Sequence, residues 1–295
     1  LFKKAGAHGK QALTMAMGFG CNAAGVVACR IIDSPRERLI ATLTNNFVPC
    51  NGRFPTLIAL SMILIGTSVH SPFAAFLTSG IVIIIVLSGV AVTFIVSFIL
   101  SKTLLKGAPS TFNLELPPYR KPQIGKVIIR SIFDRTLFVL GRAIAIALPA
   151  GAITWLVANI MIGNTSILNH ISDFLDPFGR AIGLDGIILL AFILELPANE
   201  IVLPIVFMSY LSKGAMIELN GIEEMRNIFV SNGWTWLTCL NVMLFSLFHF
   251  PCGTTLWTIK KETQSLKWTI AAFIIPTLVA ILVCFSTTRI AHWFH

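Results

Sequence analysis

Gly18-Phe19-Gly20-Cys21-Asn22 lies in the middle of an apolar run that extends from residue 12 to residue 29. Each glycine lowers helix stability by about 1 kcal/mol relative to alanine, and a bilayer tolerates an interrupted helix only where the freed backbone groups are buried or line a cavity. The stretch therefore predicts a broken helix at a substrate site. A second interruption occurs at Glu195-Leu196-Pro197-Ala198-Asn199-Glu200. Paired interruptions in the two halves of a chain are typical of a transporter's binding site.

The composition predicts an all-α polytopic membrane protein that is embedded in the lipid bilayer. Of the 295 residues, 55% are hydrophobic and only 12% are charged, which lies far outside the range of soluble domains. The uncharged runs 72–100 and 143–162 are each long enough to cross ~30 Å of hydrocarbon. The net charge of +9 comes from basic residues in short loops, which is the positive-inside pattern and not a nucleic-acid-binding stripe.

The cysteines and the missing motifs exclude several classes of protein. The six cysteines lack the paired spacing of a disulfide framework, so we expect them to be reduced. Cys29, Cys239 and Cys284 fit the role of small buried hydrophobes. The chain has no phosphate-binding loop, no H-E-x-x-H, no C-x-x-C and no G-x-S-x-G motif. This chain therefore contains no catalytic residues that we can identify, and nothing in it can hydrolyse a nucleotide.

Charge bias predicts the topology. Basic residues flank 11–29 on both sides, so we expect a re-entrant hairpin there and not a crossing. A helix starting near Asp33 or Ser34 should be too short to span. Spans are expected at 54–69, 73–100, 143–162, 234–250 and 268–288, with an amphipathic surface helix at 124–141.

The second interrupted segment, 186–211, is expected to be re-entrant from the opposite side. A crossing here would put the acidic residues around Glu223 inside and Lys260-Lys261 outside, against the usual bias. A hairpin removes that conflict and gives the inverted arrangement of a two-repeat transporter.

The interrupted segments suggest a site for a divalent transition-metal ion. Thiolates suit soft or intermediate ions, whereas carboxylate and amide oxygens suit harder ones, so a mixed set fits Fe(II). Ionisable groups inside membrane segments are costly and usually functional. His249 could share a helix face with Cys252, although a hydrogen-bonded structural histidine fits the pattern better. The candidate ligands are Cys21, Asn22, Cys50, Glu195, Asn199, Glu200 and Cys252, and the candidate hinges are Gly18, Gly20 and Pro197.

Several motifs in the same order resemble the membrane domain of FeoB-type ferrous iron transporters. They are Gly18-Phe19-Gly20-Cys21-Asn22, Arg30-Ile31-Ile32-Asp33-Ser34-Pro35-Arg36-Glu37-Arg38-Leu39, Phe47-Val48-Pro49-Cys50, Leu114-Glu115-Leu116-Pro117-Pro118-Tyr119-Arg120, Pro197-Ala198-Asn199-Glu200, Phe250-Pro251-Cys252 and Lys260-Lys261-Glu262-Thr263.

The resemblance implies two inverted gate-type repeats and uptake of Fe(II) across a bacterial inner membrane. It places Cys21, Cys50 and Cys252 in the ion path. It also implies an N-terminal GTPase domain outside this chain, and GTP would act only through that domain. The resemblance further suggests two kinds of partner, a small cytoplasmic accessory protein and other copies of the chain in a homo-oligomer. The chain would then comprise an incomplete first repeat (1–110), a cytoplasmic loop with the surface helix (111–142), and a second repeat with the C-terminal span (143–295).

Two other classes of function stay open at the level of sequence. A gate-domain carrier for nucleosides or other organic solutes would need hydrogen-bonding side chains and an aromatic platform in place of thiols. A membrane subunit that only scaffolds a complex would need no site at all. Mn(II) and Zn(II) also fit the ligand set, and the chain has the look of a fragment because it opens on Leu1.

Overall fold

The computed structural model describes residues 2, 4–65, 72–107, 123–130, 137–163, 165–211 and 221–293. The elements of the first half are α1 (Gln11–Gly20), α2 (Asn22–Ala28), η1 (Cys29–Ile31), α3 (Pro35–Thr44), η2 (Asn45–Phe47), α4 (Phe54–Ile65), α5 (Pro72–Lys102) and α6 (Ile124–Arg130). The second half contains α7 (Phe138–Asn159), β1 (Met161–Ile162), β2 (Thr165–Ser166), α8 (Ile167–Ala181), α9 (Gly186–Leu194), η4 (Asn199–Ile201), α10 (Val202–Tyr210), α11 (Ile222–Ser231), α12 (Trp236–Phe248), α13 (Gly253–Thr263) and α14 (Leu266–Trp293).

The expected all-α polytopic membrane fold is confirmed. Within the described ranges, three stretches are long and apolar enough to cross a membrane: 75–102, 236–263 (α12 with α13) and 266–293. Helices α8 and α9 are long and apolar enough only together, and the bend of 108° between them is that of a broken span or of a re-entrant loop. The strand pair β1–β2 is a two-residue antiparallel ribbon and adds no layer to the fold.

The first interrupted segment doubles back on itself, as predicted. Helix α1 packs against α2, and the chain turns at Cys21, whose backbone is extended (φ −155°, ψ 124°). The two ends of the hairpin are joined by an ion pair between Lys10 Nζ and Asp33 Oδ2 at 2.8 Å. The hydrogen bond from Lys10, followed by its charge, holds the pKa of the Asp33 carboxyl below its usual value, so the pair persists at neutral pH and is lost as the pH falls through that lowered pKa.

The second interrupted segment also doubles back. Helix α9 packs against α10, and Asp185 caps α9 by accepting a hydrogen bond from the backbone N–H of Ile188 at 2.6 Å. The Tyr210 hydroxyl, at the far end of α10, donates to the same carboxylate. Trp234 Nε1 in turn donates to the Tyr210 hydroxyl at 2.7 Å. Because residues 185 and 210 touch, the segment between them begins and ends at one side of the molecule.

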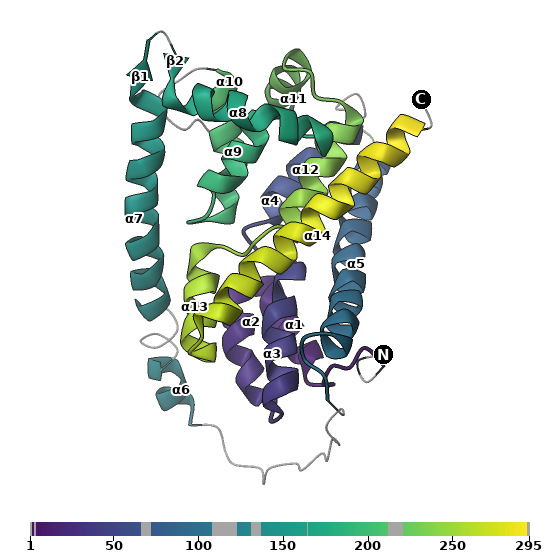
Figure 1. Ribbon diagram of the computed structural model, residues 1–295, viewed down its shortest axis with the longest axis vertical. Coiled ribbons are helices and arrows are strands. Elements are labelled where there is room, and N and C mark those ends of the chain that lie inside the picture. Colours follow the sequence, from purple (N-terminus) through teal and green to yellow (C-terminus); the bar gives the residue numbers. More distant parts are fainter. Residues whose placement is uncertain are drawn as a thin grey trace.

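The two hairpins belong to opposite ends of the molecule. Figure 1 shows α1, α2 and α3 in its lower part and α8, α9, α10 and α11 in its upper part. The acidic residue Glu223 on α11 therefore lies at the same end as α8, whereas Lys260 and Lys261 lie in the last turn of α13, which packs against α2. This is the distribution of charge that the re-entrant hypothesis required.

The predicted N-cap of α3 is confirmed, whereas the expected surface helix is shorter than predicted. Ser34 caps α3, and its side chain accepts a hydrogen bond from the backbone N–H of Glu37. The expected surface helix 124–141 corresponds to α6 only as far as Arg130, because residues 138–141 instead begin α7. Three expected features lie outside the described residues. They are the part of the surface helix at 131–136, the first two residues of the external turn at 70–72, and the extended segment at 116–119.

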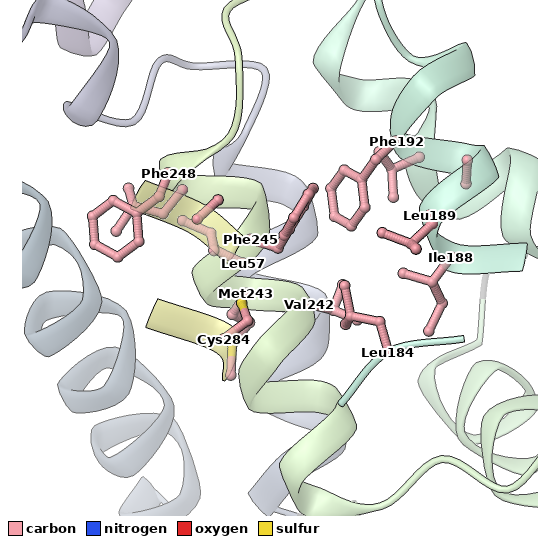
Figure 2. Close-up of a cluster of buried hydrophobic side chains, with 14 of the residues drawn as sticks. Leu57, Leu184, Ile188, Leu189, Phe192, Val242, Met243, Phe245, Phe248 and Cys284 are labelled. Carbon is pink, nitrogen blue, oxygen red and sulfur yellow. The ribbon is translucent and has the colours of Figure 1, made fainter. Parts of the chain in front are cut away.

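The hydrophobic core lies where α12 meets α9, α4 and α14. Figure 2 shows Phe192 and Ile188 of α9 facing Phe245 and Val242 of α12, and the rings of Phe192 and Phe245 have their centroids 4.7 Å apart. Aromatic pairs in such tilted arrangements contribute about 0.5–1.5 kcal/mol beyond the area that they bury. This packing fixes the carboxyl ends of α9 and α12 relative to each other, and the polar residues described below lie at those ends.

A labelling experiment can test the topology directly. In the full-length protein carrying Cys21→Ser, single cysteines introduced at Asp173 and at Glu223 should both react with an impermeant thiol reagent added outside intact cells. A cysteine at Lys261 should be protected, because the fold puts α13 at the opposite end. Reaction at position 173 together with protection at position 223 would contradict the re-entrant hairpin.

Candidate functional site

Each hairpin break is attached to a segment that contains Pro and Cys. After Pro49-Cys50, the backbone N–H of Asn51 donates to Gly20 O at 3.4 Å, at the first break. After Pro251-Cys252, the backbone N–H of Gly253 donates to Leu196 O at 2.7 Å, at the second break. In both halves, the residue that follows the cysteine therefore satisfies a carbonyl that the interrupted helix leaves free.

The two breaks also share their backbone geometry. Cys21 has φ −155° and ψ 124°, and Ala198 has φ −156° and ψ 125°. Each is followed by a buried asparagine, Asn22 or Asn199. The correspondence supports the prediction that the halves are related repeats.

The segment that contains Cys50 lies between the two breaks. Cys50 Sγ accepts a hydrogen bond from Asn199 Nδ2 at 3.5 Å. A Cβ added to Gly52 would lie only 2.7 Å from Glu200 Oε2, so the absence of a side chain at position 52 allows that carboxylate to approach. The structure thus brings together three of the predicted ligands, Cys50, Asn199 and Glu200, next to the break at Gly20.

Glu195 and His249 form a buried contact between the ends of α9 and α12. Both residues are completely buried, and Glu195 Oε1 touches His249 Nε2. The other ring nitrogen, Nδ1, lies 2.9 Å from Phe245 O and 3.0 Å from Ser246 O.

Arg53 joins the two Pro-Cys segments through backbone carbonyls. Its side chain is fully buried. One terminal nitrogen donates to Asn46 O and to Leu247 O, both at 2.9 Å. The other donates to His249 O at 3.4 Å and to Phe250 O at 3.2 Å. Arg53 therefore caps the carboxyl end of α12, where a positive charge is favoured by the helix dipole.

A chain of buried polar groups connects the first break to the second. The Asn22 side-chain amide lies 3.2 Å from the Asn46 side-chain amide, and Asn46 Nδ2 donates to His249 O at 2.6 Å. The His249 ring then reaches Glu195. Asn45, beside Asn46, occupies the space opposite Gly25, where a Cβ would lie 2.5 Å from Asn45 Nδ2. Buried polar networks of this kind hold one arrangement of the core when their members are paired.

The remaining predicted residues have distinct surroundings. Cys21 is exposed, and Cys252 is half-buried with its Sγ 3.3 Å from Thr255 Oγ1. Gly18 lies inside α1, opposite Asn45, whereas the helix ends at Gly20. Pro197 lies in the turn between Glu195 and Ala198. Cys29, Cys239 and Cys284 are buried as expected, and the six cysteines are free.

The predicted ligands do not gather into a single cluster. Among the residues that the structure describes, no group of three or more His, Cys, Asp or Glu side chains is placed to hold a metal ion. They divide instead into the Cys50–Asn199–Glu200 group, the Glu195–His249 pair, and Cys21 and Cys252 beside the two breaks.

Sequence reasoning overlooked the parts played by Arg53 and His249. The expectation of a hydrogen-bonded His249 is confirmed by its contacts with Phe245 O and Ser246 O, but its contact with Glu195 was not anticipated. The available signal was one ionisable residue in each Pro-Cys region: Arg53 lies three residues after Cys50, and His249 three residues before Cys252.

Comparison with known proteins decides the resemblance. A family model described as "Ferrous iron transport protein B C terminus" matches residues 82–134, and one described as "Nucleoside recognition" matches residues 140–266. The Fe(2+) transporter FeoB of Staphylococcus aureus is 29% identical over 300 residues, covering 98% of this chain and 42% of the relative. The resemblance to the C-terminal membrane part of FeoB is confirmed.

Other relatives of the same kind come from distant organisms. The Fe(2+) transporter FeoB of Methanocaldococcus jannaschii is 26% identical, covering 96% of this chain and 42% of the relative. A protein of Porphyromonas gingivalis named as a fusion of Fe(2+) transport protein A and Fe(2+) transporter FeoB is 26% identical, covering 98% of this chain and 39% of the relative. This chain thus spans about two fifths of the length of these FeoB relatives. No solved structure matches it.

Proposed function

We propose that this chain is the membrane part of a ferrous iron transporter and that Fe(II) crosses where the two hairpin breaks meet the Cys50 segment. The observation that carries the proposal is the contact of Cys50 with Asn199, together with the approach of Glu200 to Gly52. A thiol, an amide and a carboxylate from the two halves are thus neighbours, which supports a site for the ion between the two breaks. We take Fe(II) as the ion because the relatives are named as Fe(2+) transporters.

The wider assignment follows from the same relatives. Because the chain covers 42% of the staphylococcal relative, we place an N-terminal GTP-binding domain in the remainder of the full-length protein. The Porphyromonas fusion suggests a small accessory protein as a second partner. We assign the protein to the bacterial inner membrane as a multi-pass transporter that forms a homo-oligomer. Its repeats at 1–110 and 143–295 are separated by a cytoplasmic region at 111–142.

The alternative function is a carrier for nucleosides or another organic solute, because the family model that matches 140–266 is described by nucleoside recognition. The residues at the breaks favour the ion. A nucleoside site needs an aromatic surface on which a base can stack. Phe19 and Phe250 lie beside the breaks, but Phe250 is buried and stacked on Phe273, and the polar groups next to the breaks are thiols, carboxylates and amides.

Uptake measurements test the proposed function. In the full-length protein, Cys50→Ser replaces a soft ligand with a neutral hydroxyl, and Glu200→Gln removes the charge that offsets the desolvation of the cation. Each should lower Fe(II) uptake by iron-starved cells more than about tenfold at matched expression. Cys21→Ser should also lower uptake.

The matched control is Cys284→Ser, which should leave uptake unchanged, because the buried Cys284 of α14 donates to Asn241 O of α12 and not to a predicted ligand. Normal Fe(II) uptake by both Cys50→Ser and Glu200→Gln would remove the ion-path assignment. Uptake of labelled nucleoside by the wild type would favour the organic-solute carrier.

A further inference from the structure

An ion pair between Arg30 and Glu262 joins the two halves of the chain at the end of the molecule that holds α13. Arg30 Nε donates to Glu262 Oε2 and Arg30 Nη2 donates to Glu262 Oε1, both at 2.7 Å. A guanidinium and a carboxylate that share two parallel hydrogen bonds fix each other's orientation. The two residues are 232 positions apart, and each belongs to a sequence motif to which the proposed function gives no role.

The position of Glu262 is unfavourable without this partner. Glu262 lies in the last turn of α13, where the helix dipole favours cations and disfavours a carboxylate. Its side chain is only 16% exposed, whereas that of Arg30 is 67% exposed. A carboxylate that is mostly buried is seldom found without a partner. The partner here comes from the other half of the chain, so Glu262 serves the contact between halves and not the stability of its own helix.

Helices α2 and α13 lead from the two hairpin breaks to this ion pair. Helix α2 begins directly after Cys21, at the first break, and the chain continues through η1 to Arg30. Helix α13 begins at Gly253, whose backbone N–H donates to Leu196 O at the second break. The two helices pack against each other (Figure 1). The ion pair therefore ties together the ends of two helices that both start at a break.

The contact between these helices can be broken at low cost. Their buried residues are mostly small or polar, and small side chains let helices approach closely while little apolar surface is exposed when they part. An ion pair with an exposed partner also adds little to stability. The geometry is thus specific and the energy small, as a contact that opens and closes requires. The buried residues are Asn22, Ala23, Gly25 and Val26 in α2, and Thr254, Thr255, Thr258 and Ile259 in α13.

We infer that the Arg30–Glu262 ion pair is a latch between the two halves. When it is closed, it holds the ends of α2 and α13 together. When it opens, the helices part and the second break becomes accessible, where Cys252 is half-buried in the closed arrangement. The inference rests on the proposed function, because an ion that crosses between the breaks can leave only when one end of its path opens. The latch controls that end without binding the ion.

The test is the reactivity of Cys252 in the purified full-length protein, held in lipid nanodiscs without iron so that a thiol reagent reaches both faces. Mass spectrometry of the peptide that contains Cys252 gives the rate of alkylation. Glu262→Arg and Arg30→Glu each replace attraction by repulsion, so Cys252 should react at least about threefold faster than in the wild type. The double variant Arg30→Glu/Glu262→Arg restores the attraction and should react at the wild-type rate.

Two internal controls accompany this measurement. Lys260→Glu reverses the charge of an exposed residue in the same turn of α13 without removing either partner of the ion pair, so Cys252 should react as in the wild type. Cys284 is buried in α14 and reports unfolding, because a reagent reaches it only when the core opens. Its alkylation should stay at the wild-type rate in every variant.

The outcomes separate the latch from the proposed function. Wild-type reactivity of Cys252 in both single variants would overturn the latch. Reaction of the double variant as fast as that of the single variants would overturn it too, because the separate charges and not their pairing would then matter. Faster alkylation of Cys252 together with Cys284 would mean that the core unfolds, and would likewise overturn it. Absence of Fe(II) uptake by the wild type would instead contradict the proposed function, and the alkylation rates, measured without iron, would still decide whether the ion pair opens and closes.

Discussion

Arg53→Met is expected to unfold much of this domain. The substitution retains an apolar stem of similar length. His249 O keeps its hydrogen bond from Asn46 Nδ2, but Asn46 O, Leu247 O and Phe250 O lose the donor that Arg53 supplies. These carbonyls lie in a buried site that leaves them few other donors, and each unpaired acceptor costs about 1–3 kcal/mol. We therefore expect a loss of more than about 3 kcal/mol in the free energy of unfolding, measured by thermal unfolding of the full-length protein in detergent.

A conservative change at the same position sharpens this prediction. Arg53→Lys keeps the charge but cannot reproduce the planar fork that reaches carbonyls on two segments, so its stability should fall between those of the wild type and Arg53→Met. Arg226→Met is the control, because Arg226 is exposed on α11, and it should change stability by less than about 0.5 kcal/mol. If Arg53→Met unfolds at the wild-type temperature, Arg53 does not hold the two Pro-Cys segments together.

Gly186→Ala is expected to open the bend between α8 and α9. A Cβ at this position would lie 2.0 Å from Ser172 O and 2.9 Å from the Asp176 backbone nitrogen. Both are backbone atoms of α8, so the clash can be relieved only if the two helices separate. The backbone N–H of Gly186 also donates to Asp176 Oδ1 at 3.2 Å, and separation would lengthen this bond.

The expected cost of Gly186→Ala is about 3 kcal/mol, at the upper end for overpacking, because backbone cannot repack as a side chain can. Thermal unfolding in detergent measures it. Gly80→Ala is the matched control: Gly80 lies inside α5 with no atom within 4 Å of an added Cβ, so alanine there should stabilise the helix by up to about 1 kcal/mol. Equal stability of Gly186→Ala and the wild type would show that α8 and α9 tolerate a wider bend.

The sequence by itself determined the class of protein and the positions of the two breaks. Long uncharged runs indicate membrane helices, in which every backbone group is paired within the segment. The glycines before Cys21 and the proline after Leu196 weaken a helix locally. Both the spans and the breaks can therefore be predicted from residues that are neighbours in the sequence. The hairpin at 186–211 could also be inferred, because loop charges report the side of the membrane on which they lie. The N-cap at Ser34 was also predictable, because capping depends only on residues within one turn of the helix.

Only the tertiary structure decided which of the predicted ligands meet. Cys50 touches Asn199, which is 149 positions away, and Glu195 touches His249, because the packing of α9 against α12 sets the distance between their carboxyl ends. No local pattern encodes such a distance. The same is true of Arg53, whose sequence neighbourhood indicates only a loop. Its partners are carbonyls nearly two hundred residues away, and a buried guanidinium is stable only where the fold converges enough acceptors upon it.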